Sequence, residues 1–287
     1  MAPAIDTSVS PQVSAPPVHM LGGAAAWAVA LVGFAAAAGW ISFSQKLGDT
    51  IDTQSVAVLA LLFYGLVYLP IILIAAIMGI VCGVKVFRGG RHPAKWLLGS
   101  AGLGAAGLTL TVLYAALNGG LSVGEGSHTG GGLLMLGAAL TLLATAAQEL
   151  LLRGWLQPLL GRLTGRTLPA IAIAALASAA LQLVGGTFSW LPFLNLTLAG
   201  ALFGLLANLS GGMAAPIAAH FAWNVLEDLG LGLMPNPGTG TFGAVRDFDL
   251  LGATLWGGSE AGLAGGVGMT IVLAALLLPT LTRKAVT

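Results

Sequence analysis

Charged residues are scarce in this 287-residue chain, which contains 11 Lys and Arg and 10 Asp and Glu, or 7% of the sequence. Soluble domains carry about 25% charged residues, so this composition excludes an ordinary soluble fold. The net charge of +1 is too small for the clustered basic face that nucleic acid requires, so we expect no nucleic-acid partner. The single cysteine, Cys82, cannot form an internal disulfide, and its apolar neighbours predict a packed thiol.

The chain is instead rich in long apolar runs. Hydrophobic residues make up 57% of the chain, and 43 residues are Gly, which membrane helices tolerate and use for close packing. Runs of about 18 or more apolar residues predict an all-α, polytopic membrane helix bundle of about eight transmembrane helices. The predicted spans lie near residues 23–44, 55–84, 95–118, 131–158, 168–185, 193–210, 213–230 and 260–281.

The segment before the first span differs in composition. Residues 1–22 are rich in Pro, Ser, Ala and Val and lack the basic start of a signal peptide, so we expect a disordered cytoplasmic tail. Residues 23–284 then form a single transmembrane domain. At the entrance to the last span, Gly258, Gly262 and Gly266 repeat every four residues, which predicts close helix packing there.

Lys and Arg are distributed unevenly between the predicted loops. Eight of them fall on one side: Lys85, Arg88, Arg91, Lys95, Arg162, Arg166, Arg283 and Lys284. The opposite side keeps Lys46 and Arg246. Because cytoplasmic loops carry the excess of Lys and Arg, eight spans put both termini in the cytoplasm. We expect an integral, multi-pass protein of the bacterial inner membrane.

Two predicted spans contain ionisable side chains, which cost about 2.5–3.5 kcal/mol each at the centre of a membrane and therefore need a partner or a function. Glu149 and Arg153 are four residues apart, so on a helix they share a face and can pair. This pair is either a structural ion pair that neutralises two buried charges or part of a functional site. His220, Asn224 and Glu227 follow at i, i+4 and i+7 in the seventh span and form one stripe, which favours a site.

The fifth span adds Gln182, its one strongly polar side chain. Counted along the helices at about 1.5 Å per residue, Glu149, Gln182 and His220 lie at compatible depths. We therefore expect Glu149 to pair with Arg153, and His220 with Asn224 to face Gln148 and Gln182 across a shared cavity.

These segments resemble the signature of the CPBP family of intramembrane proteases, which includes the type II CAAX prenyl endopeptidases and bacteriocin-processing relatives. The family pattern is E-E-x-x-x-R on one span, F-x-x-x-H on the next and H-x-x-x-N two spans later. The corresponding segments here are residues 148–153, 178–182 and 220–224. The flanking residues 153–158 and 214–216 are also typical, and the resemblance covers a core of about residues 131–230.

The resemblance implies a bundle whose cavity opens to the membrane and the cytoplasm. In the family, the first Glu activates water, and two histidines with an Asn complete the site. Carried onto this chain, the family-equivalent catalytic positions include Glu149, Arg153, His220 and Asn224. Members of the family are described as glutamate-dependent or metal-dependent, and peptide hydrolysis needs a base together with oxyanion donors or a metal.

The chain departs from the family pattern at its most reactive positions. Gln148 replaces the first Glu, and a neutral amide cannot act as a base. Gln182 replaces the histidine of the second motif, which removes an imidazole. Ser178 stands where the family has Phe. These replacements predict that ordinary proteolysis is lost.

We therefore expect a protease-like membrane protein without ordinary proteolytic activity, which acts as a binding, regulatory or structural subunit for another membrane protein or a transmembrane peptide in the lipid bilayer. One alternative is an active CAAX-type endopeptidase with a rearranged site, in which Glu227 substitutes for the missing base. A second alternative is a small-molecule transporter, although the chain shows no internal repeat. We expect no metal and no cofactor, since zinc applies only to the active-protease alternative and needs at least three ligands.

Overall fold

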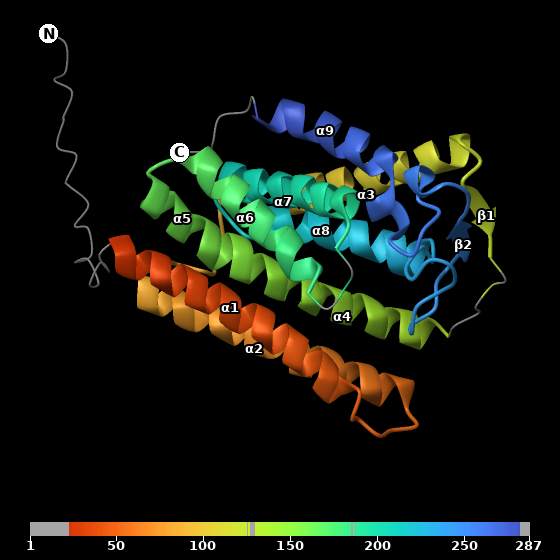
Figure 1. Cartoon of the computed structure of the whole chain (residues 1–287), viewed down its shortest axis with the longest axis horizontal. Coiled ribbons are helices and arrows are strands. Elements are labelled where there is room, and N and C mark those ends of the chain that lie inside the picture. Colours follow the sequence, from red (N-terminus) through yellow and green to blue (C-terminus); the bar gives the residue numbers. More distant parts are fainter. Residues whose placement is uncertain (1–22, 125, 127–129, 185, 187, 282–287) are drawn as a thin grey trace, which may run out of the picture.

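The computed structural model describes residues 23–124, 126, 130–184, 186 and 188–281. These residues form a bundle of helices with one short two-stranded sheet at one end (Figure 1). The elements, in chain order, are α1 (Gly23–Gly48), α2 (Val56–Cys82), α3 (Pro93–Leu117), β1 (Leu121–Val123), α4 (Gly131–Glu149), the π-helical segment η1 (Leu150–Leu156), α5 (Gln157–Thr164), α6 (Thr167–Gln182), α7 (Trp190–Ser210), α8 (Ala214–Val225), the π-helical segment η2 (Leu226–Gly230), β2 (Phe248–Leu250), the 3-10 turns η3 (Thr254–Trp256) and η4 (Gly262–Gly265), and α9 (Val267–Leu281). The predicted tail, Arg283 and Lys284 lie outside the described residues.

The predicted helix bundle is confirmed, and every predicted span corresponds to a helical run. Within the described part of the chain, five runs are long and apolar enough to cross a membrane: Gly23–Gly48, Val56–Cys82, Pro93–Leu117, Gly131–Thr164 and Trp190–Ser210. The other runs are shorter, with 16 residues in α6, 15 in α9 and 12 in α8 before it continues as η2. α7 and α8 are separate helices, because Gly211 adopts a left-handed φ of 66° and turns the chain.

One sequence-based prediction about the last span is wrong. The span begins at Val267 rather than near residue 260. Gly262 lies in η4 with a positive φ of 54°, and Gly258 lies in the loop before it. The left-handed φ of Gly262 would strain a side chain, and a Cβ at Gly258 would overlap the backbone of Leu251 and Gly252. Neither glycine therefore belongs to a helix-packing stripe.

The longest helical run, Gly131–Thr164, contains a π-helical segment at its centre. Pro158 follows this segment and has no N–H to donate to the preceding turn, which locally breaks the α-helical hydrogen-bond pattern. All seven residues of η1 are buried, including Arg153 and Trp155. η1 therefore lies at the centre of the bundle and carries the arginine predicted for the site.

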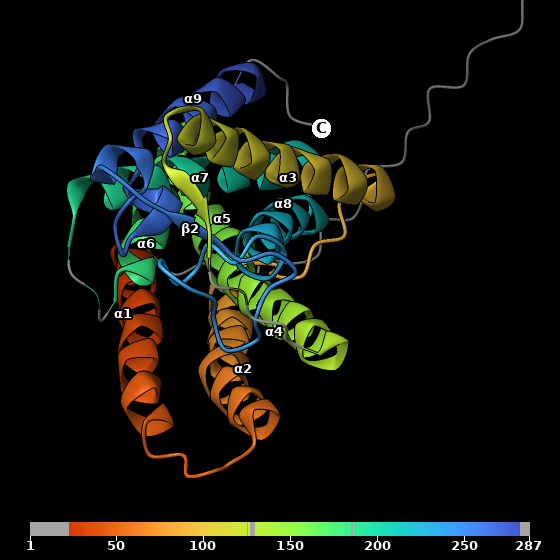
Figure 2. The ribbon, with the colours of Figure 1, turned by 90° about the vertical axis from the view of Figure 1, so that its right-hand side faces the viewer.

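Two large apolar clusters hold most of the described helices together, and a third, smaller one joins α2, α4 and η2. The first large cluster joins α1, α2, α5 and α6 around Trp155, and the second joins α3, α7, α8 and α9 around Leu108 and Trp223. Figure 2 shows the α1–α2 hairpin on one side of the bundle and α3 with α9 on the opposite side. The site residues of α4, α7 and α8 lie between these two groups.

The two ends of the bundle differ in charge. α1 begins and α9 ends at the same end (Figure 1). The loops and helix ends there contain Lys85, Arg88, Arg91, Lys95, Arg162 and Arg166 and, among the described residues, no acid. The opposite end contains Lys46, Arg246, Asp49, Asp52, Asp247, Asp249 and Glu260.

A short sheet and a long loop cover the acidic end. β1 pairs antiparallel with β2, with Leu121 opposite Leu250. The Asn236 side chain donates to the carbonyls of Leu250 and Ser259 at 3.1 and 2.9 Å, and its Oδ1 accepts from the Leu250 amide at 2.8 Å. These bonds hold the loop that places Met234 against the cavity described next.

Candidate functional site

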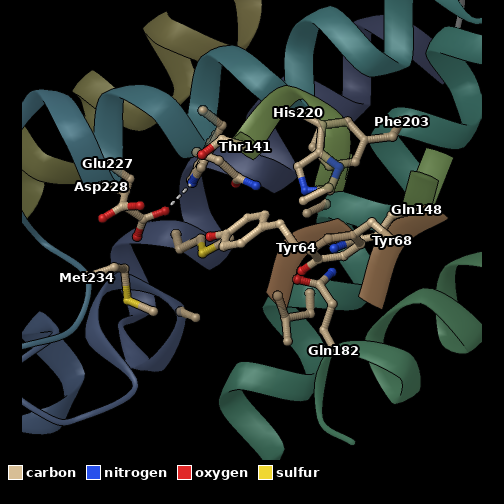
Figure 3. A pocket seen from close by; sticks show the side chains of 17 residues that line it. Tyr64, Tyr68, Thr141, Gln148, Gln182, Phe203, His220, Glu227, Asp228 and Met234 are labelled. Carbon is tan, nitrogen blue, oxygen red and sulfur yellow. Dashed lines mark hydrogen bonds between the residues drawn. The ribbon is translucent and has the colours of Figure 1, made fainter. Parts of the chain in front are cut away.

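A cavity of about 290 Å³ lies between α2, α4, α6, α7 and α8. The predicted residues Gln148, Gln182, His220 and Asn224 all line it (Figure 3). Three helices far apart in sequence therefore place their polar groups at one depth, as the helix-rise argument predicts. The structure thus establishes that these four side chains line one cavity. Their catalytic roles stay predictions.

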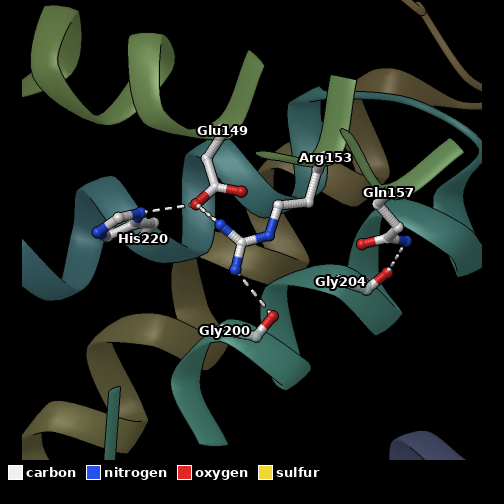
Figure 4. A network of polar contacts seen from close by, with 6 residues as sticks. All are labelled: Glu149, Arg153, Gln157, Gly200, Gly204 and His220. Atoms are coloured by element: carbon white, nitrogen blue, oxygen red, sulfur yellow. Dashed lines mark hydrogen bonds and ion pairs between the residues drawn. The ribbon is translucent and has the colours of Figure 1, made fainter. Parts of the chain in front are cut away.

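Glu149 and Arg153 lie behind the cavity wall and are fully buried, each with 0% exposure. Arg153 Nη1 donates to Glu149 Oε1 at 3.0 Å, which is the predicted ion pair. The same oxygen lies 2.8 Å from Nδ1 of His220 (Figure 4). An ionised carboxylate only accepts hydrogen bonds, so His220 Nδ1 carries the hydrogen and Nε2 is left for the cavity.

The aromatic ring of Phe203 supports this network from α7. His220 stacks on it with ring centroids 4.7 Å apart and an interplanar angle of 15°. The Arg153 guanidinium carbon lies 5.7 Å from the centre of the same ring, within the range of cation–π attraction. The imidazole is therefore fixed by a hydrogen bond on one edge and a ring on one face.

Glycines of α7 allow the long helix to approach closely. Arg153 Nη2 donates to the Gly200 carbonyl at 2.9 Å, and Gln157 Nε2 donates to the Gly204 carbonyl at 3.0 Å (Figure 4). A Cβ at Gly204 would lie 2.8 Å from Gln157 Oε1. The absence of side chains at these two positions lets buried polar groups reach the α7 backbone.

Two carboxyl groups line the cavity away from the histidine. Glu227 and Asp228 of η2 lie at the opposite end from His220 in Figure 3. Trp223 Nε1 donates to Glu227 Oε2 at 2.9 Å. Glu227, which the helical stripe predicted beside the site, thus shares the cavity with His220, and Asp228 is an addition that the stripe did not predict.

The side chains present do not fit a catalytic zinc site. Such a site needs three protein ligands and an open fourth position. In the described part of the chain, no group of three or more His, Cys, Asp and Glu side chains is placed to hold a metal ion. Amides occupy the two cavity positions, 148 and 182, where the family pattern has an acid and an imidazole.

Sequence reasoning missed part of the cavity wall. Tyr64 and Tyr68 of α2 line the cavity, and Gln148 lies within hydrogen-bonding reach of Tyr68. The signal was present, because two tyrosines four residues apart put two hydroxyl groups on one face of an otherwise apolar span. Met234 also lines the cavity but belongs to a loop, whose position no periodic pattern reveals.

The comparisons with known proteins agree with the motif analysis. Residues 130–226 match the model of a family described as Type II CAAX prenyl endopeptidase Rce1-like. The matched segment runs from the start of α4 to the end of α8 and contains Gln148, Gln182 and His220. The predicted resemblance to CAAX prenyl endopeptidases is therefore confirmed over this segment. No curated protein and no solved structure matches the chain.

Proposed function

We propose that this membrane protein, similar to the CAAX prenyl endopeptidases over residues 130–226, uses its cavity to bind a segment of another membrane protein and does not hydrolyse it. The observation that carries the proposal is the pair of amides, Gln148 and Gln182, on the cavity wall beside His220. They stand at the positions where the family pattern has the water-activating Glu and a histidine.

The chemistry of these two replacements supports a loss of hydrolysis. A general base contributes about 10²–10⁴ to a rate, and an oxyanion donor contributes about 10²–10³. Glu149 does not restore the base, because its Oε1 is shared between Arg153 and His220 and the side chain is fully buried. The retained Glu149–Arg153–His220 network then serves to keep the cavity open and shaped.

The cavity suits binding of a peptide segment. Its wall combines amides and hydroxyls, which can bond a peptide backbone, with the rings of Tyr64, Phe203 and Trp223, which can pack against apolar side chains. We infer that the protein acts as a regulatory or structural subunit that holds a transmembrane peptide. We also propose that its basic end faces the cytoplasm, in a bacterial inner membrane.

The decisive experiment restores the family residues. Purified wild-type protein and the Gln148→Glu/Gln182→His double variant are incubated with a prenylated CAAX peptide and with a transmembrane peptide, and cleavage is followed by mass spectrometry. We expect no cleavage by the wild type and measurable cleavage by the double variant. Adding His220→Ala to the double variant should abolish that cleavage, which controls for contaminating proteases.

A stoichiometric membrane protein that co-purifies with the wild type, and is lost when Tyr64 and Phe203 are changed to Ala, supports the binding role. Cleavage by the wild type that depends on His220 overturns the proposal. Uptake of a small molecule into proteoliposomes would instead favour a transporter.

A rearranged active site is the second candidate, and the carboxyls of Glu227 and Asp228 in the same cavity as His220 favour it. In this candidate, Glu227 or the His220 Nε2 takes the proton from the attacking water. The Glu227→Gln and Asp228→Asn variants test it in the same cleavage assay. This candidate requires wild-type cleavage that falls by about 10²-fold or more when the acting base is removed.

A further inference from the structure

The cavity contains acidic groups that the chain does not neutralise. Two carboxyl side chains, Glu227 and Asp228, line it at the end away from His220, and no Lys or Arg of the described residues lines it (Figure 3). The ion pairs found in the described part of the chain both involve Glu149, which contacts Arg153 and His220. Glu227 and Asp228 therefore have no basic partner there.

Among the described residues, one neutral donor reaches these two carboxyl groups. Trp223 Nε1 donates to Glu227 Oε2 at 2.9 Å. The other three carboxyl oxygens accept no hydrogen bond from the described residues, and they are not among the enclosed polar atoms that lack a partner. Both side chains are half-buried and line the cavity, so these oxygens are accessible from it. Because acids inside a membrane bundle are almost always paired, the missing cation points to a ligand.

His220 gives a second, independent indication of a ligand. The residue is only 5% exposed, and its Nδ1 lies 2.8 Å from Glu149 Oε1. Its Nε2 has no hydrogen-bond partner among the described residues and is not enclosed by them, so it opens onto the cavity that the residue lines. Since Nδ1 carries the hydrogen, Nε2 is an acceptor that needs a donor.

Aromatic side chains complete the wall. Tyr64, Tyr68, Phe203 and Trp223 line the cavity, and in Figure 3 Tyr64 lies between the carboxyl groups and His220. The face of an aromatic ring attracts a cation, most strongly where water is excluded. Carboxylates, ring faces and an imidazole acceptor together match an ammonium or guanidinium group, whose N–H groups all donate. The cavity of about 290 Å³ is far larger than one water molecule, which takes about 30 Å³ in the liquid.

We propose that the peptide segment held by this cavity carries a lysine or arginine side chain, whose charged group lies against Glu227, Asp228 and the neighbouring rings. This inference rests on the proposed binding function and names the partner class, a membrane segment with one basic residue among apolar ones. Lys and Arg hold their charge at the end of a flexible stem. The charge can therefore reach the carboxyl groups while the peptide backbone bonds to Gln148 and Gln182.

The affinity of the partner has a physical source in this arrangement. A basic side chain is costly in lipid, and the cavity offers it two carboxyl groups instead. The two carboxyl groups gain their missing partner in the same step. Binding thus removes two unfavourable charges at once, which a wholly apolar segment cannot do.

The test uses three fluorescent peptides of about 20 residues, the length that spans a membrane. They share one leucine–alanine sequence with uncharged ends and differ at the central position, which is Lys, Gln or Leu. Binding to the purified full-length protein in one detergent is followed by fluorescence anisotropy. We expect the Lys peptide to bind at least tenfold more tightly than the other two. This comparison uses the wild type, so it does not depend on the folding of any variant.

The outcomes separate this inference from the proposed function. Equal binding of all three peptides that is lost in Tyr64→Ala/Phe203→Ala overturns the inference and leaves the binding function standing. Binding of none of them overturns both. Cleavage of the bound peptides, detected by mass spectrometry, overturns the proposed function but not the preference for a basic side chain.

Four variants locate the charge. Glu227→Gln and Asp228→Asn preserve the shape of each side chain and should each weaken binding of the Lys peptide at least threefold, and the double variant should bind all three peptides alike. Glu260→Gln removes an exposed acid outside the cavity lining and should keep the preference. Unfolding followed by tryptophan fluorescence verifies that each variant is folded. A preference for the Lys peptide that survives in the double variant overturns the proposal.

A free organic amine offers the same cation without a peptide, and a competition arm distinguishes the two sources. Butylamine should displace the Lys peptide only at millimolar concentration and leave the other peptides bound. Displacement at micromolar concentration assigns the carboxyl groups to a small amine and overturns the assignment to a peptide.

Discussion

At the scale of single residues, the most telling feature is a carboxylate with no access to solvent. Glu149 accepts from Arg153 at 3.0 Å and from His220 at 2.8 Å through one oxygen, while its Oε2 has no partner among the described side chains and backbone groups. Arg153 compensates the charge and binds the Gly200 carbonyl. The pair is therefore both an electrostatic clip and the support of the cavity histidine.

We expect Arg153→Met to destabilise the protein by about 3–5 kcal/mol, because removing one partner of a buried ion pair leaves the other charge uncompensated. The matched control is Arg91→Met, which changes an exposed arginine. Unfolding followed by tryptophan fluorescence in mixed detergent measures both. Equal unfolding midpoints for the two variants would contradict the expected role of the buried pair.

The same reasoning predicts how the two members of the buried pair depend on each other. Glu149→Gln/Arg153→Met replaces both charges with uncharged groups and should be less destabilising than Arg153→Met alone, because no unpaired charge remains. A double-mutant cycle with the two single variants gives the coupling free energy. A double variant as unstable as the sum of the single variants would show that Glu149 and Arg153 do not act as a unit.

At the scale of elements, close approach between helices decides where the site residues lie. A Cβ at Gly104 of α3 would overlap the backbone of Ala219, which directly precedes His220 in α8. Gly102, on the same helix, has nothing within 4 Å of the corresponding Cβ position. The two glycines differ in packing alone, so they form a natural pair of test and control positions.

We expect Gly104→Val to destabilise the protein by about 1–3 kcal/mol, as overpacking does, and to displace α8. Gly102→Val adds a side chain at an exposed position and should change stability only by the helix-propensity difference, which favours Val over Gly by about 0.5 kcal/mol or less. Thermal unfolding in one detergent compares them. If Gly102→Val is the more harmful substitution, the α3–α8 contact is not as close as the structure has it.

At the scale of the whole molecule, charge is separated along the bundle axis. Within the described residues, the end where α1 begins and α9 ends carries Lys and Arg alone, whereas the other end carries most of the acids. The excess of basic residues predicts that this end faces the cytoplasm.

Cysteine labelling tests this orientation in intact cells. In a Cys82→Ala background, Arg91→Cys and Arg166→Cys should be protected from a membrane-impermeant maleimide until the cells are opened, and Asp52→Cys should react at once. All three positions are exposed. Labelling of positions 91 and 166 from opposite faces would contradict the bundle topology, and immediate labelling of both would reverse the orientation.

Much of this protein follows from local sequence alone. A run of apolar residues forms a helix in a membrane because each backbone group must bond within the segment. The eight helical runs among the described residues can therefore be predicted without tertiary information. The spacing of Glu149 and Arg153 also predicts their ion pair, because side chains four residues apart lie on the same face of one helix. The substitutions Gln148 and Gln182 are visible in the motifs themselves, which lie within the segment that matches the family model.

Contacts between distant segments were decided only by the tertiary structure. No helical period links Tyr64 of α2, Met234 of a loop and Asp228 of η2, which meet at one cavity. The glycines before α9 resembled a packing stripe, but their backbone conformation depends on the turns around them. The contact of His220 with Glu149 required α3, α4, α7 and α8 to pack at fixed distances, because helix packing depends on side-chain volumes across the interface and not on spacing within one helix.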